Sequence, residues 1–148
     1  QAGILQVKLR RLPDWNESRR ACARRYAELL APVAGLIALP HEPSWARAVH
    51  HLYVVRVPNR AEVQQELAAA GIGTGIHYPI PLHLQRAYSA LDCSGRDLAV
   101  SERTAPELLS LPMFPGLEPG QQERVAERLK AAAAVEAVAG LSEQVAGR

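Results

Sequence analysis

Residues 51–78 read HLYVVRVPNRAEVQQELAAAGIGTGIHY, and they contain a strand pattern, a helix pattern and a glycine-rich segment in direct succession. The part 51–57 is rich in β-branched and aromatic residues and ends at a proline, which predicts a strand. The part 60–70 is expected to be a helix, because Asn59 and Glu62 have the spacing of a capping box and a glycine follows the helix. This order favours an α/β fold in which helices cover a sheet.

The chain after this helix predicts short extended segments separated by loops. Residues 73–78 read as the glycine-rich entry to a short strand, which Pro79 and Pro81 end because proline lacks the amide that a strand ladder needs. A loop with turn-like helical pieces is expected as far as Gly95. The remaining elements expected on this side are a helix capped by Asp97 that reaches Thr104, a short strand at 109–111, and a last helix from Pro119 to about Val138.

The chain before the quoted stretch predicts a long amphipathic helix. An apolar stripe with steps of three, four and seven residues runs from Leu5 to Leu29. Pro13 lies inside this stripe, which stays in phase across it, so we expect one bent helix and not two separate helices. Residues 36–39 are expected to form a brief strand.

Together these patterns predict one small α/β (α+β) unit with two to four strands. We expect a long bent helix over residues 1–31, the α/β domain over residues 32–139 and a frayed tail over residues 140–148. The sequence has neither a run of about 18 apolar residues nor a signal-peptide pattern, so no membrane span and a cytoplasmic location are expected.

The basic residues are unusual in kind. Only Lys8 and Lys130 among the 17 basic residues are lysines. Arginines gather on the first helix, but glutamates interrupt them and the net charge is +2, which favours a solvated helix face over a nucleic-acid surface. Binding that weakens steeply with salt would indicate nucleic acid instead. The chain begins at Gln1 and its one methionine is Met113, so we expect further sequence upstream.

The histidines and cysteines lack the spacing of a metal site or of an activated nucleophile. No histidine pair has an HExxH pattern, and Cys22 and Cys93 have no CxxC spacing, so we expect no metal. No serine lies in a GxSxG turn, which leaves a hydrolase without support. The histidines are His41, His50, His51, His77 and His83.

The segment 71–83 is the densest in residues capable of chemistry. Its three glycines let backbone approach a ligand, and His77 and Tyr78 lie between them and the prolines. Neighbouring residues of a strand point to opposite faces, so both side chains can face a ligand only if the pleat ends at Pro79. The alternative is that Tyr78 packs into the core with the flanking isoleucines while His77 lies at a polar edge.

Residues 71–85, GIGTGIHYPIPLHLQ, resemble a signature of the DegT/DnrJ/EryC1/StrS family, the sugar aminotransferases of the aspartate aminotransferase fold. Three other segments are similar to the family: Leu12–Tyr26 with its Trp-Asn pair, the strand at 51–57, and Ser110–Met113. The resemblance covers nearly the whole chain and thins after Leu129.

This resemblance implies transfer of an amino group, usually from glutamate, through pyridoxal 5'-phosphate (PLP) to a keto group on a nucleotide-linked deoxyhexose. It implies the small C-terminal domain of that fold (fold type I), a short and mostly antiparallel sheet covered by helices and preceded by a long helix. The family would place this domain in a homodimer with active sites at the interface. By motif, His77 and Tyr78 lie on the substrate side of the cleft and would bind sugar hydroxyls or phosphoryl oxygens.

The family's Schiff-base lysine and most of its cofactor contacts lie upstream of the equivalent of Gln1, so no catalytic residue carries over and the cofactor-binding residues stay unassigned. Lys8 and Lys130 are poor substitutes, because a Schiff-base lysine must be held at the cofactor with a deprotonated amine. We expect the chain alone neither to bind PLP covalently nor to catalyse transamination without an N-terminal PLP domain. Two alternatives stay open: a stand-alone ligand-binding or interaction module with the same fold, and a PLP-dependent sugar dehydratase.

Overall fold

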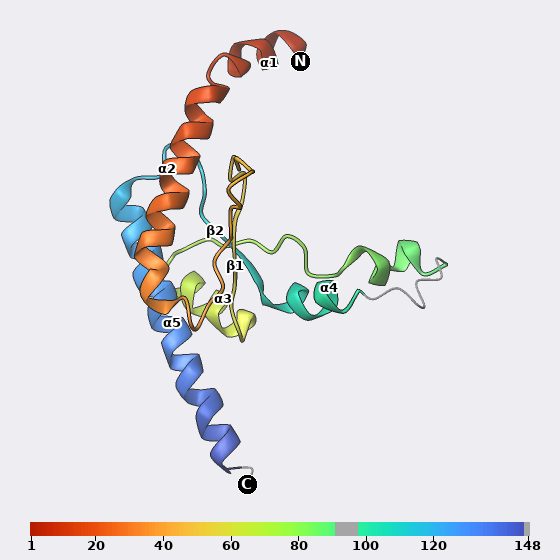
Figure 1. Cartoon of the computed structure of the whole chain (residues 1–148), viewed down its shortest axis with the longest axis vertical. Helices are drawn as coiled ribbons and strands as arrows, with labels where there is room; N and C mark the ends of the chain where they lie inside the picture. Colours follow the sequence, from red (N-terminus) through yellow and green to blue (C-terminus); the bar gives the residue numbers. More distant parts are fainter. Residues whose placement is uncertain (91–97, 147–148) are drawn as a thin grey trace.

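A computed structural model of the protein describes residues 1–90 and 98–146. Figure 1 shows a body in which α2, α3 and α5 pack beside two strands, with α1 and the end of α5 projecting at opposite ends. A third projection leaves the side of the body. We call it the arm and define it as residues 76–90 and 98–107.

The sheet consists of two antiparallel strands, β1 (Tyr53–Arg56) and β2 (Leu108–Leu111). Tyr53 pairs with Leu111 and Val55 with Leu109, and all four side chains are buried in the core. Since side chains alternate along a strand, the residues between them lie on the opposite face. We call this second face the open face; it carries Val54, Arg56, Leu108 and Ser110.

Two further extended segments flank this pair as single bridges. Ala38 bridges Arg56 on the outer side of β1, and Gly75 bridges Ser110 on the outer side of β2. The prediction of brief strands at 36–39 and 73–78 is therefore wrong, although both segments lie at the edges of the sheet where further strands would pair. Prolines follow both segments closely, and their missing amides prevent a longer ladder.

Three helices cover the inner face of the sheet: α2 (Leu12–Leu30), α3 (Arg60–Ala69) and α5 (Pro119–Ala146). Each buries one stripe of small or apolar side chains at helical spacing, which removes those side chains from water. The Gln122 side-chain amide of α5 donates to the Cys22 carbonyl of α2 over 2.9 Å, so this buried polar group has a partner. The stripes are Cys22, Ala23, Tyr26 and Leu30 in α2, Val63 and Leu67 in α3, and Val125, Ala126, Leu129, Ala132 and Ala133 in α5.

The N-terminal helix is broken and not merely bent. Helix α1 (Ala2–Leu9) ends before a turn at Arg10 and Arg11, and α2 begins at Leu12. The expectation of one bent helix is wrong, because Pro13 lies in the first turn of α2, where a missing amide costs no intrahelical hydrogen bond. The apolar stripe stays in phase because the turn between the helices is short.

Helix α3 follows the sequence expectation in extent but not in its cap. Gly71 follows it with φ 74°, the left-handed stop that the pattern predicts. Asn59 itself takes a left-handed conformation with φ 50° and makes no side-chain capping hydrogen bond, so the expected capping box with Glu62 is wrong.

The arm consists of short helical turns. The described turns are the 3-10 helices η2 (Leu82–Leu84), η3 (Arg86–Tyr88) and η4 (Ala105–Glu107) and the helix α4 (Ala99–Thr104). They confirm the turn-like pieces and the helix expected to reach Thr104. The expected cap Asp97, together with Gly95 and Cys93, lies outside the described residues.

Helix α5 continues to Ala146, so the helical part reaches beyond the end expected near Val138 and includes most of the tail expected to be frayed from residue 140. An alanine-rich sequence favours helix strongly, and one glycine inside it costs only about 1 kcal/mol. Within the described part of the chain, no helix has the length and apolar character needed to cross a membrane.

Candidate functional site

His77 lies on the open face of the sheet. The backbone amide and carbonyl of Gly75 both pair with Ser110, which brings the following residues of the arm over β2. The His77 ring then reaches the strand, and its Nδ1 lies 2.9 Å from the Ser110 hydroxyl. The site thus forms on the face opposite the helices.

Gly75 is needed for this position of the ring. A Cβ built on Gly75 would lie 2.7 Å from Cε1 of His77, closer than real Cβ contacts. A larger residue at this position would displace the imidazole from the place it has here.

Tyr78 lies beside His77 and not on the opposite side of the chain. The two ring centroids are 5.7 Å apart in an edge-to-face arrangement at 76°. Tyr78 is 72% exposed and Ile80 is 51% exposed, so the alternative that Tyr78 packs into the core is wrong. The two residues lie outside any strand, and strand alternation therefore does not separate them.

A hollow of about 260 Å³ adjoins Tyr78 on the arm. Its walls come from the segment after Tyr78 and from α4 with the turn that follows it. Ser101 and Thr104 lie among its lining residues, but the Thr104 hydroxyl already donates to the Val100 carbonyl. This hollow extends the open face with a mainly apolar wall.

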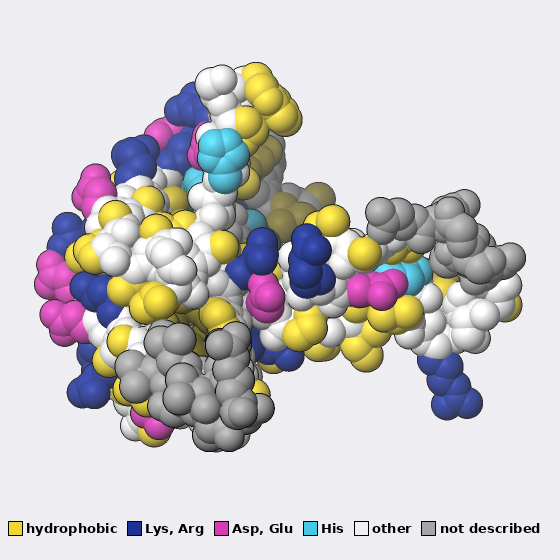
Figure 2. Space-filling view, turned by 60° about the horizontal axis from the view of Figure 1, so that its bottom comes forward, with side chains coloured by type: hydrophobic (Ala, Val, Ile, Leu, Met, Phe, Trp, Pro, Cys, Tyr) yellow, Lys and Arg dark blue, Asp and Glu magenta, His cyan; other side chains and the backbone are white. Residues whose placement is uncertain are grey.

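His83 is not part of this site. Its Nε2 lies 2.8 Å from the Glu102 carboxylate, and this contact joins the two halves of the arm. Figure 2 shows the arm standing away from the body with hydrophobic side chains on its surface. His83 therefore links two parts of the arm, whereas His77 contacts the sheet and Tyr78 is exposed.

A second polar cluster, which the sequence did not predict, lies between α2 and residues 40–50. Arg20 is anchored by its Nε, which donates to the Ala48 carbonyl over 2.8 Å, and both Arg20 and Arg47 form ion pairs with Glu17. This corrects the expectation that the arginine face is simply solvated, because the Arg20 side chain is only 15% exposed. Its partner carbonyl lies 28 residues away, beyond the reach of any local pattern.

Glu42 closes the same cluster from the loop. Its carboxylate accepts a hydrogen bond from the Ala48 backbone amide and lies 3.2 Å from Nε2 of His50. The Ala48 amide, followed by His50, lowers the pKa of Glu42. The charged groups of this cluster are therefore largely paired with one another, and they line a cavity of about 400 Å³.

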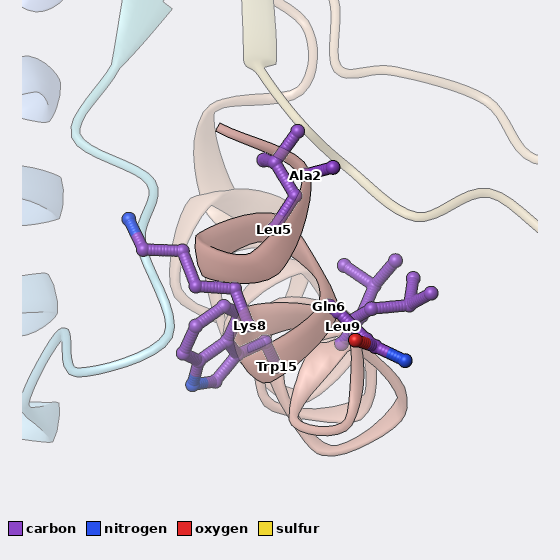
Figure 3. A pocket seen from close by; sticks show the side chains of 7 residues that line it. Ala2, Leu5, Gln6, Lys8, Leu9 and Trp15 are labelled. Carbon is purple, nitrogen blue, oxygen red and sulfur yellow. The ribbon is translucent and has the colours of Figure 1, made fainter.

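Lys8 does not have the surroundings of a PLP lysine. Lys8 is exposed on α1 and lines an apolar cavity of about 610 Å³ together with Leu5 and Trp15 (Figure 3). No carboxylate lines this cavity to pair with a pyridine nitrogen, and no arginine, serine or threonine lines it to bind a phosphate. Lys130 is half-buried on α5. The cavity beside Lys8 therefore lacks the groups that would hold PLP.

Residues 1–90 and 98–135 contain no group of three metal-ligating side chains. Cys22 is buried in α2, and burial raises the pKa of its thiol. This thiol packs against the Leu117 carbonyl and does not face the open face of the sheet.

Comparison with known proteins gives close sequence relatives. The chain is 44% identical over 133 residues to the erythromycin biosynthesis sensory transduction protein EryC1 of Saccharopolyspora erythraea, a match that covers 90% of this chain and 36% of that relative. It is 38% identical over 130 residues to a dTDP-3-amino-3,4,6-trideoxy-alpha-D-glucose transaminase of Streptomyces venezuelae, which covers 88% of this chain and 34% of the relative. The chain thus spans about a third of the length of these relatives.

Solved structures agree with the sequence relatives. The S. venezuelae DesV in complex with a ketimine intermediate is similar with a TM-score of 0.82 and 38% identity, over 90% of this chain and 36% of that chain. The PLP form of the putative sugar aminotransferase Spr1654 from Streptococcus pneumoniae is similar with a TM-score of 0.75 and 26% identity, over 86% and 33% of the two chains. These similarities confirm the expected aminotransferase fold with its short antiparallel sheet and covering helices.

The family model named DegT/DnrJ/EryC1/StrS aminotransferase family matches residues 1–130. This match includes every element that carries the motifs discussed above, from the paired N-terminal helices through the glycine-rich segment to the first turns of α5. The chain therefore belongs to the DegT/DnrJ/EryC1/StrS aminotransferase family.

Proposed function

We propose that this chain is the C-terminal part of a PLP-dependent aminotransferase that transfers an amino group to the keto group of a nucleotide-linked sugar. The family match over residues 1–130 carries the proposal. The names of relatives such as the S. venezuelae transaminase support a nucleotide sugar as acceptor. Glutamate is the proposed amino donor.

In this proposal His77 and Tyr78 contact the sugar substrate. Both lie on the open face, Tyr78 is largely exposed, and no described residue hydrogen-bonds Nε2 of His77. An imidazole nitrogen and a phenol hydroxyl can both donate to phosphoryl or carbonyl oxygens. When bound, PLP would supply the electron sink for the reaction. The lysine that holds it would come from the N-terminal part, since the cavity beside Lys8 offers no partner for the cofactor and Lys130 is half-buried on α5.

We further propose that the protein acts in the cytoplasm as a homodimer in which the N-terminal part covers this chain's exposed apolar surface. Helix α1 has no buried residue, although most of its side chains are apolar. A helix that is apolar on most sides is normally covered in the assembled protein. The apolar side chains on the arm support the same conclusion.

A non-catalytic module is the second candidate. It is favoured by one observation, namely that EryC1, a relative at 44% identity, is named as a sensory transduction protein. Such a module would use the open face to bind a ligand or a partner without turnover. The two candidates differ in whether this chain can complete an active enzyme.

A chimera tests the proposed function. We would join the part of the S. venezuelae transaminase that precedes its match to this chain, and assay amino transfer with that relative's own sugar substrate. We expect an active chimera. His77→Ala should lower kcat/KM about ten- to hundredfold, and Tyr78→Phe up to about tenfold, because each removes a hydrogen bond to the substrate.

His83→Ala is the matched control, since His83 lies on the same arm but contacts Glu102. Its kcat/KM should stay within about threefold of the unsubstituted chimera. A chimera that folds and shows the absorbance of bound PLP but transfers no amino group would contradict the proposal and favour the non-catalytic module. Equal losses for His77→Ala and His83→Ala would remove His77 from the site.

A further inference from the structure

The His77 ring is held from two directions, by Ser110 and by Gly75. Ser110 lies on one side, with its hydroxyl 2.9 Å from Nδ1. Gly75 lies against the ring, so close that a Cβ added to it would come within 2.7 Å of Cε1. These two residues are also paired with each other through both backbone hydrogen bonds, of 3.0 and 2.8 Å. The ring, the glycine and the serine therefore contact one another as one unit.

The burial of Ser110 determines the direction of the hydrogen bond. Ser110 is only 4% exposed, and Nδ1 of His77 is the one partner that the described residues give its hydroxyl. If the hydroxyl only accepted a hydrogen bond from the ring, its own proton would be buried without an acceptor, which is costly. The hydroxyl therefore donates to Nδ1, and in the neutral ring the proton lies on Nε2.

The other ring nitrogen is open. Nε2 makes no hydrogen bond to a described residue and is not among the buried polar atoms that lack a partner, so it reaches the solvent beyond the sheet. An N–H at this position is a donor and suits an oxygen acceptor, such as a phosphoryl or keto oxygen. An outward acceptor nitrogen would suit a hydroxyl group instead.

We propose that Ser110 and Gly75 are positioning residues for His77, and that they fix its imidazole so that Nε2–H points as a donor toward an oxygen of the substrate. This inference rests on the proposed function, in which His77 contacts the sugar substrate. It adds the orientation and protonation of the ring and assigns roles to two residues 35 positions apart in the chain.

Nuclear magnetic resonance of the chain itself tests the geometry without any sugar or cofactor. With histidines labelled with ¹⁵N and ¹³C at pH 8, where imidazole is ordinarily neutral, we expect His77 to carry its proton on Nε2. We also expect a nuclear Overhauser effect between Hε1 of His77 and Hα of Gly75. Ser110→Ala should abolish this effect, because the ring loses its anchor, and Ser110→Thr should restore it.

His83 provides an internal control in the same spectra, because it lies on the arm and contacts Glu102. Its signals should not change in any Ser110 variant. A proton on Nδ1 in the unsubstituted chain would overturn the proposal, and so would a Hε1–Hα effect that survives in Ser110→Ala. The unsubstituted spectrum decides the first point even if a variant fails to fold.

A double-mutant cycle in the chimera tests the functional link. Ser110→Ala should lower kcat/KM about ten- to hundredfold when His77 is present, as expected for a misplaced contact group. It should have little further effect when His77 is already alanine, because it acts only through the ring. Equal losses in both backgrounds would make Ser110 merely structural. An inactive chimera would count against the proposed function but would leave the spectroscopic result in force.

Discussion

Tyr26 and Tyr53 meet in the middle of the core, with ring centroids 5.0 Å apart. Burial raises the pKa of Tyr53 to about 12, and burial with the neighbouring Cys22 raises the pKa of Tyr26 further. Both phenol hydroxyls must stay protonated in the folded protein, so the stabilisation that comes from their raised pKa values is complete below pH 10. It is lost as pH rises through the unfolded pKa toward the folded pKa.

We therefore expect the free energy of unfolding to fall between pH 9.5 and pH 11.5, measured by urea denaturation. Tyr53→Phe should reduce this fall by up to about 2 kcal/mol, because phenylalanine keeps the ring and removes the titrating hydroxyl. Tyr88→Phe, at a 43% exposed position on the arm, is the matched control and should leave the pH dependence unchanged. An identical pH dependence in Tyr53→Phe would show that this phenol does not titrate with unfolding.

At the scale of elements, the packing of α5 against α2 and α3 holds the body together. Leu129 is fully buried on the inner stripe of α5, whereas Val135 on the same helix is 66% exposed. Because both residues lie on one helix, a comparison between them separates burial from helix propensity.

Leu129→Ala should lower the free energy of unfolding by about 2 to 5 kcal/mol, from lost burial and the cavity left behind. Val135→Ala should change it by less than about 0.5 kcal/mol, since alanine suits an exposed helical position. Urea unfolding followed by circular dichroism measures both. Similar losses of unfolding free energy in the two variants would show that Leu129 is not part of the core.

At the scale of the whole molecule, the two lysines lie on different helices, one that projects from the body and one that packs into it. Figure 1 shows α1 and the far end of α5 at the two ends of the molecule, with the strands between them. Lys8 is on α1 and Lys130 is on α5. Neither helix belongs to the open face that carries His77.

We expect incubation with PLP and reduction with borohydride to label no lysine of this chain specifically and stoichiometrically, as mass spectrometry of peptides would show. A variant with both Lys8→Arg and Lys130→Arg provides the background of nonspecific labelling at the N-terminal amine. The active chimera should by contrast carry its label in the part taken from the relative. Stoichiometric labelling of Lys8 or Lys130 would mean that this chain itself binds the cofactor covalently.

The sequence by itself determined the local elements and the family. β1, α3 and β2 lie where the residue patterns predict them, because β-branched runs, glycine stops and proline breaks act over a few neighbouring residues. The run GIGTGIHYPIPLHLQ identified the family and pointed to His77 and Tyr78. The wrong predictions also concerned local features. Asn59 does not cap its helix with its side chain, and Pro13 lies at the start of a helix instead of bending one.

Only the tertiary structure decided which groups meet. Ser110 reaches His77 from 33 residues away, and Arg20 reaches Ala48 from 28 residues away. It also decided that two of the four extended segments form single bridges, and that His77 lies on the face away from the helices. Which strands pair, and on which face of the sheet a residue lies, depend on the packing of buried side chains that are distant in the sequence. Local propensities do not contain that information.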